Sequence, residues 1–441
     1  MSQTMHSDRQ TAFIATRRQM FGWALGGAAL AASSSPARAF WQSAAPFAGL
    51  RNYINDYVAS RRLPGAIAAF ALGQGPVQTV AAGTLAMDSR TPVDLDSLWR
   101  IYSMTKPITG IAVMQLIEQG RMTLDQPLHD VLPRFRTMRV LTSADAPIDQ
   151  TVPAERAITI RHLLTHTAGL GYSIVQRGPI KDYYERRGIV PGQVSRMSIP
   201  GLDRGRPAPS LEAFSDALAD APLVYQPGTR WSYSISLDLL GRVIEVVSGM
   251  PFDAYLQRHI FEPLGMASTG FRVPEANIPR LSTNYAPVGG ILLPIDPATS
   301  SIYLDQPAFP FGGAGLVSSA RDYDRFLAML MNEGSLDGER VLAPETARLA
   351  MSNLLPDGID TNGTFAAGAG FGAGGRVSLA SSPEGEGTFG WGGAAGTIAM
   401  VNTRRRVRFA GYANYMPSEA YDFQRRVAEV FLTDLRAMVG A

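Results

Sequence analysis

The chain has 441 residues, of which 46% are apolar, and its 40 basic and 38 acidic side chains nearly cancel. This length predicts two or three domains, or one large domain with an insertion, and it can bury a core without a disulfide or a metal. The balanced charge gives no electrostatic case for nucleic-acid binding, and the absence of cysteine excludes disulfides, thiolate metal sites and a cysteine nucleophile. Lysine occurs only at Lys106 and Lys181, so a lysine is an unusual choice in this chain.

Residues 1–39 are expected to be an export signal. Arg17-Arg18 resembles the paired arginines of a twin-arginine signal, an apolar run follows over 20–32, and 37–39 (Ala-Arg-Ala) fits a small-x-small cleavage site. The alternative, a membrane anchor, is disfavoured because a spanning helix needs about 20 apolar residues. We therefore expect export to the bacterial periplasm or the cell exterior by the twin-arginine route, with no stable membrane anchor.

Two β-like runs, 66–72 and 77–82, are joined by a glycine-containing turn and predict a hairpin. A helix is predicted from about Met104 to Gln119, because apolar residues occupy most of its sides and a glycine closes it. Residues 173–210 are rich in proline, glycine and charge, and we expect them to form a long loop that covers a site. Shorter helices are predicted at 160–165, 237–247 and 252–260.

Strand character returns late, at 388–391, 397–401 and 407–413. The arginine cluster at 404–408 falls between the last two runs and predicts a solvated hairpin tip. Apolar residues recur at helical spacing over 423–438, which predicts a terminal helix lying on a sheet.

This order of elements predicts an α/β (α+β) fold. An antiparallel sheet would be built from both chain ends and flanked by helices, with a mainly helical insertion between them. We expect residues 40–120 and 285–441 to form the α/β sheet domain, and residues 121–284 to form the helical insertion domain.

Several common sites are excluded. The chain has no G-x-S-x-G elbow and no Gly-Lys pair of a phosphate-binding loop, and the G-x-G-x-x-G at 370–375 is not followed by a helix. His162 and His166 have the spacing of a zinc pair, but Leu163 stands where the general-base glutamate would follow. We therefore expect no metal and no cofactor, and a packing role for His166 near the site.

One short motif, Ser103-Met104-Thr105-Lys106, does indicate a catalytic site. At this spacing Ser103 and Lys106 lie on one face of a helix, one turn apart, with the serine at the helix N-terminus. A desolvated lysine can accept the proton of a serine, whereas an arginine keeps its own. The alternative is that Lys106 is an ordinary solvated charge on the surface. Two observations disfavour it: the rest of the predicted helix is apolar, and the chain uses arginine at almost every other basic position.

Three motifs in order resemble the serine β-lactamase-like hydrolases, a superfamily that includes class C β-lactamases, D-alanyl-D-alanine carboxypeptidases and family VIII carboxylesterases. The resemblance spans about residues 45–435. The motifs are Ser103-x-x-Lys106, Tyr233-Ser234-Ile235 and Trp391-Gly392-Gly393, and the connecting segments 160–170, 226–234, 262–266 and 312–322 are similar too.

The resemblance implies a β-lactamase-like fold and an acyl-enzyme mechanism. Ser103 would be the nucleophile, Lys106 and Tyr233 would share the acid–base work, and the backbone N–H groups of Ser103 and Ala394 would form the oxyanion hole. Which of Lys106 and Tyr233 takes the serine proton stays open, because coupled groups titrate together. The alternatives are a packed aromatic for Tyr233 and a buried core side chain for Trp391.

Two positions depart from the β-lactamase pattern. In β-lactamases and carboxypeptidases the second motif ends in an asparagine that binds a substrate amide, and the third begins with a lysine that assists carboxylate recognition. Here Ile235 and Trp391 would replace both contacts by an apolar wall, as in the family VIII esterases, and Gly392 and Gly393 would let substrate approach the strand.

We therefore expect a serine carboxylesterase acting on a small-molecule ester, with weak β-lactam hydrolysis as an open side activity. The alternatives are a β-lactamase, a D-alanyl peptidase or another amide hydrolase, and a non-catalytic binding protein on the same fold. The sequence does not predict the oligomeric state.

Overall fold

The structure is a computed structural model that describes residues 46–199, 201–202, 205–380, 382 and 385–439. The predicted export signal at 1–39 lies outside these residues. Residues 47–441 form one compact unit. Within the described part of the chain, no helix is both long and apolar enough to cross a membrane.

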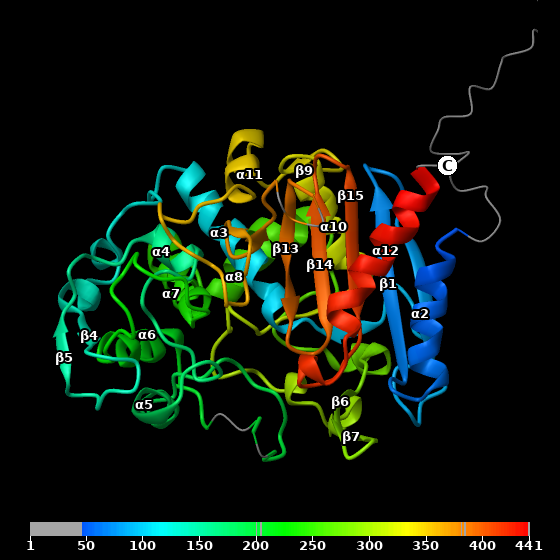
Figure 1. The fold of residues 1–441 in the computed structure, drawn as a ribbon, viewed down its shortest axis with the longest axis horizontal. Coiled ribbons are helices and arrows are strands. Elements are labelled where there is room, and N and C mark those ends of the chain that lie inside the picture. Colours follow the sequence, from blue (N-terminus) through cyan, green and yellow to red (C-terminus); the bar gives the residue numbers. More distant parts are fainter. Residues whose placement is uncertain (1–45, 200, 203–204, 381, 383–384, 440–441) are drawn as a thin grey trace, which may run out of the picture. The chain divides into compact units, whose positions relative to one another are not determined.

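The centre of this unit is an antiparallel sheet, which has seven strands among the described residues, in the order β11-β12-β13-β14-β15-β1-β2 (Figure 1). The two chain ends meet where β1 pairs with β15, with Phe70 opposite Phe409. The predicted sheet from both chain ends is thereby confirmed. Its strands are β1 (Gly65–Leu72), β2 (Gln78–Gly83), β11 (Gly370–Phe371), β12 (Arg376–Val377), β13 (Thr388–Gly393), β14 (Thr397–Asn402) and β15 (Val407–Tyr412).

Helices cover both faces of this sheet (Figure 1). On one face α2 (Ala48–Ala59) packs beside α12 (Phe423–Val439), the predicted terminal helix. The ring of Phe431 on α12 lies 4.9 Å from that of Phe70 and 4.7 Å from that of Phe409, so an aromatic cluster joins helix and sheet. On the other face lie α10 (Ala320–Met331) and α3 (Thr105–Glu118), and α11 (Pro344–Ala350) packs against α3.

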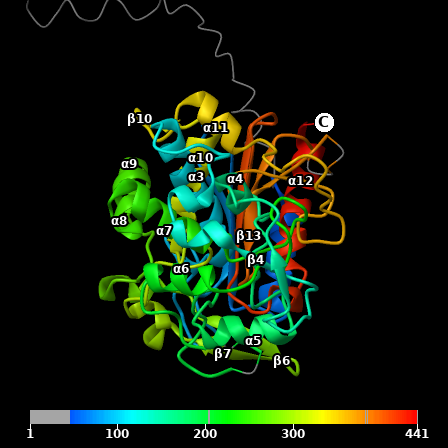
Figure 2. The same ribbon diagram turned by 90° about the vertical axis from the view of Figure 1, so that its left-hand side faces the viewer.

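The insertion is mainly helical and lies beside the sheet; in the view from that side α4, α6 and α7 are in front (Figure 2). The division into a sheet domain and an insertion domain stays a prediction. The helices of this region are α4 (Ile160–Leu164), α5 (Gly178–Arg186), α6 (Leu211–Ala219), α7 (Ser236–Ser248), α8 (Phe252–Leu256) and α9 (Glu262–Leu264). Strand pairs outside the main sheet are β3 (Leu98–Arg100) with β8 (Val317–Ser319), β4 (Arg139–Leu141) with β5 (Thr151–Pro153), β6 (Asn284–Val288) with β7 (Ile291–Asp296), and β9 (Ser335–Leu336) with β10 (Glu339–Arg340).

The expectation of a continuous loop over 173–210 is wrong in part, because α5 lies within it. Ile180 and Tyr184 of this helix are buried, and the Tyr184 hydroxyl accepts the backbone N–H of Gly171 at 3.0 Å. The helix is short and largely polar, so tertiary contacts of two side chains stabilise it rather than a periodic apolar pattern.

The arginine cluster is also only partly a solvated hairpin tip. Arg404, Arg405 and Arg406 are exposed in the turn between β14 and β15, as predicted. Arg408 is buried instead, and its Nε lies 2.7 Å from Oδ1 of Asp324 on α10. Every residue of β15 is buried, so Arg408 lies inside the protein, where the Asp324 carboxylate compensates its charge.

Candidate active site

Ser103 lies in a single 3₁₀ turn, Tyr102–Met104, that connects β3 to α3. Tyr102 has φ 41°, in the left-handed region that non-glycine residues rarely adopt. Such strain persists only where the surroundings enforce it, and it occurs most often at functional sites. The Ser103 side chain retains 8% exposure and lines a groove at the surface.

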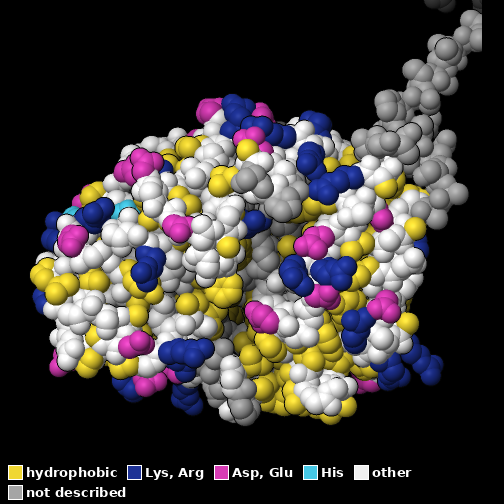
Figure 3. All heavy atoms as spheres, in the orientation of Figure 1, with side chains coloured by type: hydrophobic (Ala, Val, Ile, Leu, Met, Phe, Trp, Pro, Cys, Tyr) yellow, Lys and Arg dark blue, Asp and Glu magenta, His cyan; other side chains and the backbone are white. Residues whose placement is uncertain are grey.

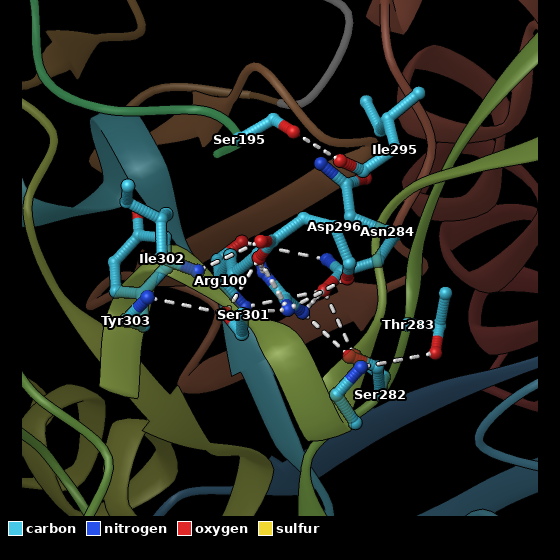
Figure 4. A network of polar contacts seen from close by, with 12 residues as sticks. Arg100, Ser195, Ser282, Thr283, Asn284, Ile295, Asp296, Ser301, Ile302 and Tyr303 are labelled. Atoms are coloured by element: carbon cyan, nitrogen blue, oxygen red, sulfur yellow. Dashed lines mark hydrogen bonds and ion pairs between the residues drawn. The ribbon is translucent and has the colours of Figure 1, made fainter. Parts of the chain in front are cut away.

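A fully buried ion pair joins Arg100, at the end of the strand that leads into this turn, to Asp296 (Figure 4). Arg100 Nε donates to Asp296 Oδ2 at 2.6 Å, and its Nη2 donates to the Asp296 carbonyl at 2.9 Å and to Ser301 Oγ at 3.0 Å. Asn414 Oδ1 accepts the backbone N–H of Arg100 at 3.3 Å. The buried charges are paired and hydrogen-bonded. The network therefore holds β3, the strand that precedes Ser103, against β7 and against the segment that follows β7.

Two side chains converge on the Ser103 hydroxyl oxygen. Lys106 Nζ lies 3.2 Å from Ser103 Oγ, and the Tyr233 hydroxyl donates to the same oxygen at 2.8 Å. Lys106 Nζ also lies 4.6 Å from the centre of the Tyr233 ring and donates to the Gly313 carbonyl at 2.6 Å. Lys106 has 0% exposure, so it is not a solvated surface charge.

Asp238 is a buried carboxyl group beside this cluster that the sequence analysis missed. Its Oδ1 accepts the N–H of Gly313 at 2.9 Å, and the carbonyl of the same glycine accepts Lys106 Nζ. Burial raises the pKa of Asp238 to about 6, while the charge of Lys106 and the Gly313 N–H act in the opposite direction. The sequence did contain a feature that could have indicated this buried carboxyl group, because Asp238 stands among leucines in an apolar helical pattern.

Asp238→Asn is expected to change how stability depends on pH. A carboxyl whose pKa is raised on folding contributes stability below its unfolded value, and that contribution is lost as pH rises through the folded pKa of about 6. Between pH 4 and pH 7 the wild-type protein should therefore lose about 2 kcal/mol relative to Asp238→Asn. Urea unfolding of both proteins at the two pH values measures this difference, and a difference that is independent of pH would contradict it.

β13 carries the third motif along the groove. Gly393 packs against the carbonyl of Ile101, two residues before Ser103, and an added Cβ would overlap with that oxygen. Ala394 follows at the end of the strand, and no backbone carbonyl of the described residues accepts its N–H. Ser103 and Ala394 line the same groove, which is the arrangement that a two-donor oxyanion hole requires.

Trp391 is half-buried in the groove wall rather than in the core. Its indole N–H donates to the Tyr233 hydroxyl at 3.0 Å, and the two rings lie 5.5 Å apart. Tyr233 therefore accepts one hydrogen bond from Trp391 and donates one to Ser103. It is more than a packed aromatic side chain.

Ile235 does not lie where the sequence analysis placed it. It has 0% exposure at the N-terminus of α7, and it is not among the described residues that line the groove. The side chain packs in the core because the tight turn that leads into α7 points it inward, so Ile235 does not form a substrate-contacting wall.

The groove has a volume of about 700 Å³ and runs from Ser103 along β13 and β14 to α12. Figure 3 shows this face hollowed between the helical insertion and the sheet. Charged side chains from α12, among them Arg425 and Glu429, line the groove as well. Its apolar lining includes Ile174, Phe365, Trp391, Ile398, Met400 and Leu432.

The two histidines have structural contacts. His162 Nδ1 accepts the backbone N–H of Thr159 at 3.2 Å and caps α4. His166 Nδ1 lies 2.9 Å from Ser234 Oγ, and its ring lies 4.8 Å from that of Tyr233, so the predicted packing role is confirmed. Burial lowers the pKa of His162 to about 4 and the pKa of His166 well below its ordinary value, so both rings are neutral at neutral pH.

Comparison with known proteins agrees with this geometry. The sequence model named Beta-lactamase matches residues 50–432. The chain belongs to the beta-lactamase family. Esterase EstB from Burkholderia gladioli is 33% identical to it over 391 residues, covering 84% of this chain and 91% of EstB. The resemblance predicted from the three motifs is thereby confirmed.

Solved structures of the same fold extend the comparison. EstCE1, described as a hydrolase with promiscuous acyltransferase activity, superposes with a TM-score of 0.70 at 27% identity, covering 88% of this chain and 97% of EstCE1. Simvastatin synthase (LovD) from Aspergillus terreus has a TM-score of 0.72 at 23% identity over 90% of this chain and 99% of LovD. The predicted β-lactamase-like fold is confirmed, and this beta-lactamase-family chain is a serine hydrolase.

Proposed function

We propose that this serine hydrolase is a carboxylesterase that forms an acyl-enzyme on Ser103. The observation that carries the proposal is the convergence of Lys106 and Tyr233 on the Ser103 hydroxyl oxygen, at 3.2 Å and 2.8 Å. A weak nucleophile needs an adjacent base in hydrogen-bond contact, and both groups are in reach. The likeness to an esterase at 33% identity supports the same activity.

The reaction proceeds in two halves. Ser103 Oγ attacks the ester carbonyl while the Lys106–Tyr233 pair takes its proton, and the backbone N–H groups of Ser103 and Ala394 bind the oxyanion. The pair returns a proton to the leaving alcohol, which departs from the acyl-enzyme. A water molecule then repeats the attack and releases the acid and Ser103.

Trp391 and Lys106 both hold Tyr233 in place. The indole N–H donates to the Tyr233 hydroxyl oxygen at 3.0 Å. Lys106 Nζ lies 4.6 Å from the centre of the same ring. Trp391 thus has a polar role toward Tyr233 in addition to its apolar surface in the groove.

We expect the apolar surface that Trp391 presents to the groove to favour a neutral substrate at that position. Trp391 stands where the third motif of β-lactamases has a lysine, and an unpaired substrate carboxylate against an apolar wall is costly. We predict that kcat/KM for p-nitrophenyl butyrate exceeds that for benzylpenicillin by at least about 100-fold, or about 2.7 kcal/mol in transition-state binding. Both constants are measured on one preparation at neutral pH. A ratio near one, or one that favours the penicillin, would support a β-lactamase instead.

The same proposal includes the location of the enzyme and its substrate class. The paired arginines and the small-x-small site within 1–39 support export by the twin-arginine route to the periplasm or the cell exterior. The partner is a small-molecule ester, and the catalytic groups of the proposed mechanism are side chains and backbone groups of this chain, with water as the second reactant.

A further inference from the structure

Gln424 of α12 reaches across to the turn between β13 and β14. Its side-chain Nε2 lies 2.6 Å from the carbonyl oxygen of Gly393 and 2.7 Å from that of Thr397. These two carbonyls belong to paired residues on either side of the turn, since Gly393 lies opposite Thr397. Both N–H bonds of the amide are therefore used to hold the turn closed.

The Gly393 carbonyl has a direct geometric link to the oxyanion hole. It belongs to the same peptide unit as the N–H of Ala394, and in a planar trans peptide these two groups point in opposite directions. A donor that fixes the carbonyl on one side therefore fixes the direction of the N–H on the other. Ala394 lines the groove that also contains Ser103.

The contact with Gln424 also affects the strength of this N–H as a donor. A hydrogen bond to the carbonyl polarises the amide, and linked hydrogen bonds strengthen one another by about 10–30% per bond. Gln424 donates at 2.6 Å, a short contact for an amide donor. Orientation and polarisation of the peptide both favour binding of an oxyanion.

The neighbouring glycine provides the space for this contact. A Cβ added to Gly392 would lie 2.8 Å from Gln424 Nε2, closer than the two atoms can approach. The glycine at position 392 therefore leaves room for the Gln424 amide.

From these contacts we infer that Gln424 is a positioning residue for the oxyanion hole: it orients and polarises the peptide whose N–H, that of Ala394, binds the developing negative charge. The inference rests on the proposed function. It assigns a role in transition-state binding to a side chain of the terminal helix that lies outside all three motifs.

The first test removes the donor and leaves an apolar side chain of similar size. In Gln424→Leu, kcat/KM for p-nitrophenyl butyrate should fall at least about tenfold. Loss of a whole oxyanion donor lowers kcat about 10²–10³-fold, and this variant keeps the donor but no longer holds it in place. Gln115→Leu is the matched control, because Gln115 Nε2 also donates to two backbone carbonyls, those of His259 and Val341, both at 3.0 Å. This control should keep its rate within about twofold at a similar loss of melting temperature.

A thionoester substrate separates positioning from general damage. Sulfur fits an oxyanion hole poorly, so wild-type enzyme should prefer the oxygen ester over its thiono analogue, and Gln424→Leu should lose most of this preference. Equal rates for Gln424→Leu and Gln115→Leu, with an unchanged preference for the oxygen ester, would overturn the inference. Wild-type protein that hydrolyses no ester would instead contradict the proposed function.

Gln424→Glu keeps the test decisive if the leucine variant does not fold. An ionised carboxylate repels both carbonyls, whereas a protonated one donates to one of them. The activity of Gln424→Glu relative to wild type should therefore rise as pH is lowered from 7 to 5. A relative activity that is constant over this range would overturn the inference.

Discussion

Ser103→Ala is expected to lower kcat for ester hydrolysis at least about 10³-fold, because removing a nucleophile leaves only binding and the oxyanion hole to act. The substitution removes one hydroxyl group that accepts from Lys106 and Tyr233. Lys106 keeps the Gly313 carbonyl as a partner, so the fold should persist. Initial rates with p-nitrophenyl butyrate measure the loss.

The stability of Ser103→Ala has to be measured beside its rate. A melting temperature close to that of the wild type assigns the lost activity to chemistry rather than to unfolding. A folded Ser103→Ala that retains more than a few per cent of the activity would show that another group attacks the ester.

Lys106→Arg is expected to abolish activity almost as completely. Arginine keeps the positive charge but cannot release its proton, so it cannot act with Tyr233 in proton transfer. The chain contains a natural control, since Lys181 is the only other lysine and forms an ion pair with Glu185 on α5 at 3.1 Å. Lys181→Arg should leave both activity and melting temperature unchanged, because arginine can keep the ion pair and such i,i+4 helix pairs contribute only about 0.3–0.5 kcal/mol.

The guanidinium group is larger than the ammonium group it would replace, and Lys106 is fully buried. Lys106→Met therefore accompanies it as a variant that removes the charge and retains an unbranched side chain. Both variants should be inactive if Lys106 transfers protons. An active Lys106→Arg with an inactive Lys106→Met would instead show that Lys106 acts as a fixed positive charge.

Local patterns were sufficient to predict the sheet and the nucleophile helix. The runs at 66–72 and 77–82 became β1 and β2 with ends shifted by about a residue, and α3 begins one residue after its predicted start. These elements are apolar and fully packed, so their periodicity is visible in the sequence itself. The motif order predicted the family for a similar reason, because each motif is a short continuous stretch.

Features that depend on distant partners were not predictable in this way. Arg408 is buried because α10 brings Asp324 to it, and Asp238 is buried against a glycine that lies 75 residues further along the chain. Gln424 contacts a strand end 31 residues away. A polar residue has no periodicity of its own that indicates burial, so tertiary structure alone shows its partner.

For Ile235 the local motif itself led to a wrong prediction. Its position in the second motif predicted a substrate contact, but motif position fixes the backbone and not the direction of each side chain. The turn into α7 buries it, and of the two departures from the β-lactamase pattern only Trp391 lines the groove.

The most direct test of the acyl-enzyme on Ser103 is to identify the residue that reacts. A fluorophosphonate transfers its phosphonyl group to an activated serine oxygen with loss of fluoride, and mass spectrometry of the digested protein locates the adduct. The structure predicts one adduct, on the peptide that contains Ser103, and no adduct in Ser103→Ala or Lys106→Arg. An adduct on another residue, or an unlabelled protein that still hydrolyses esters, would contradict the assignment of Ser103 as the nucleophile.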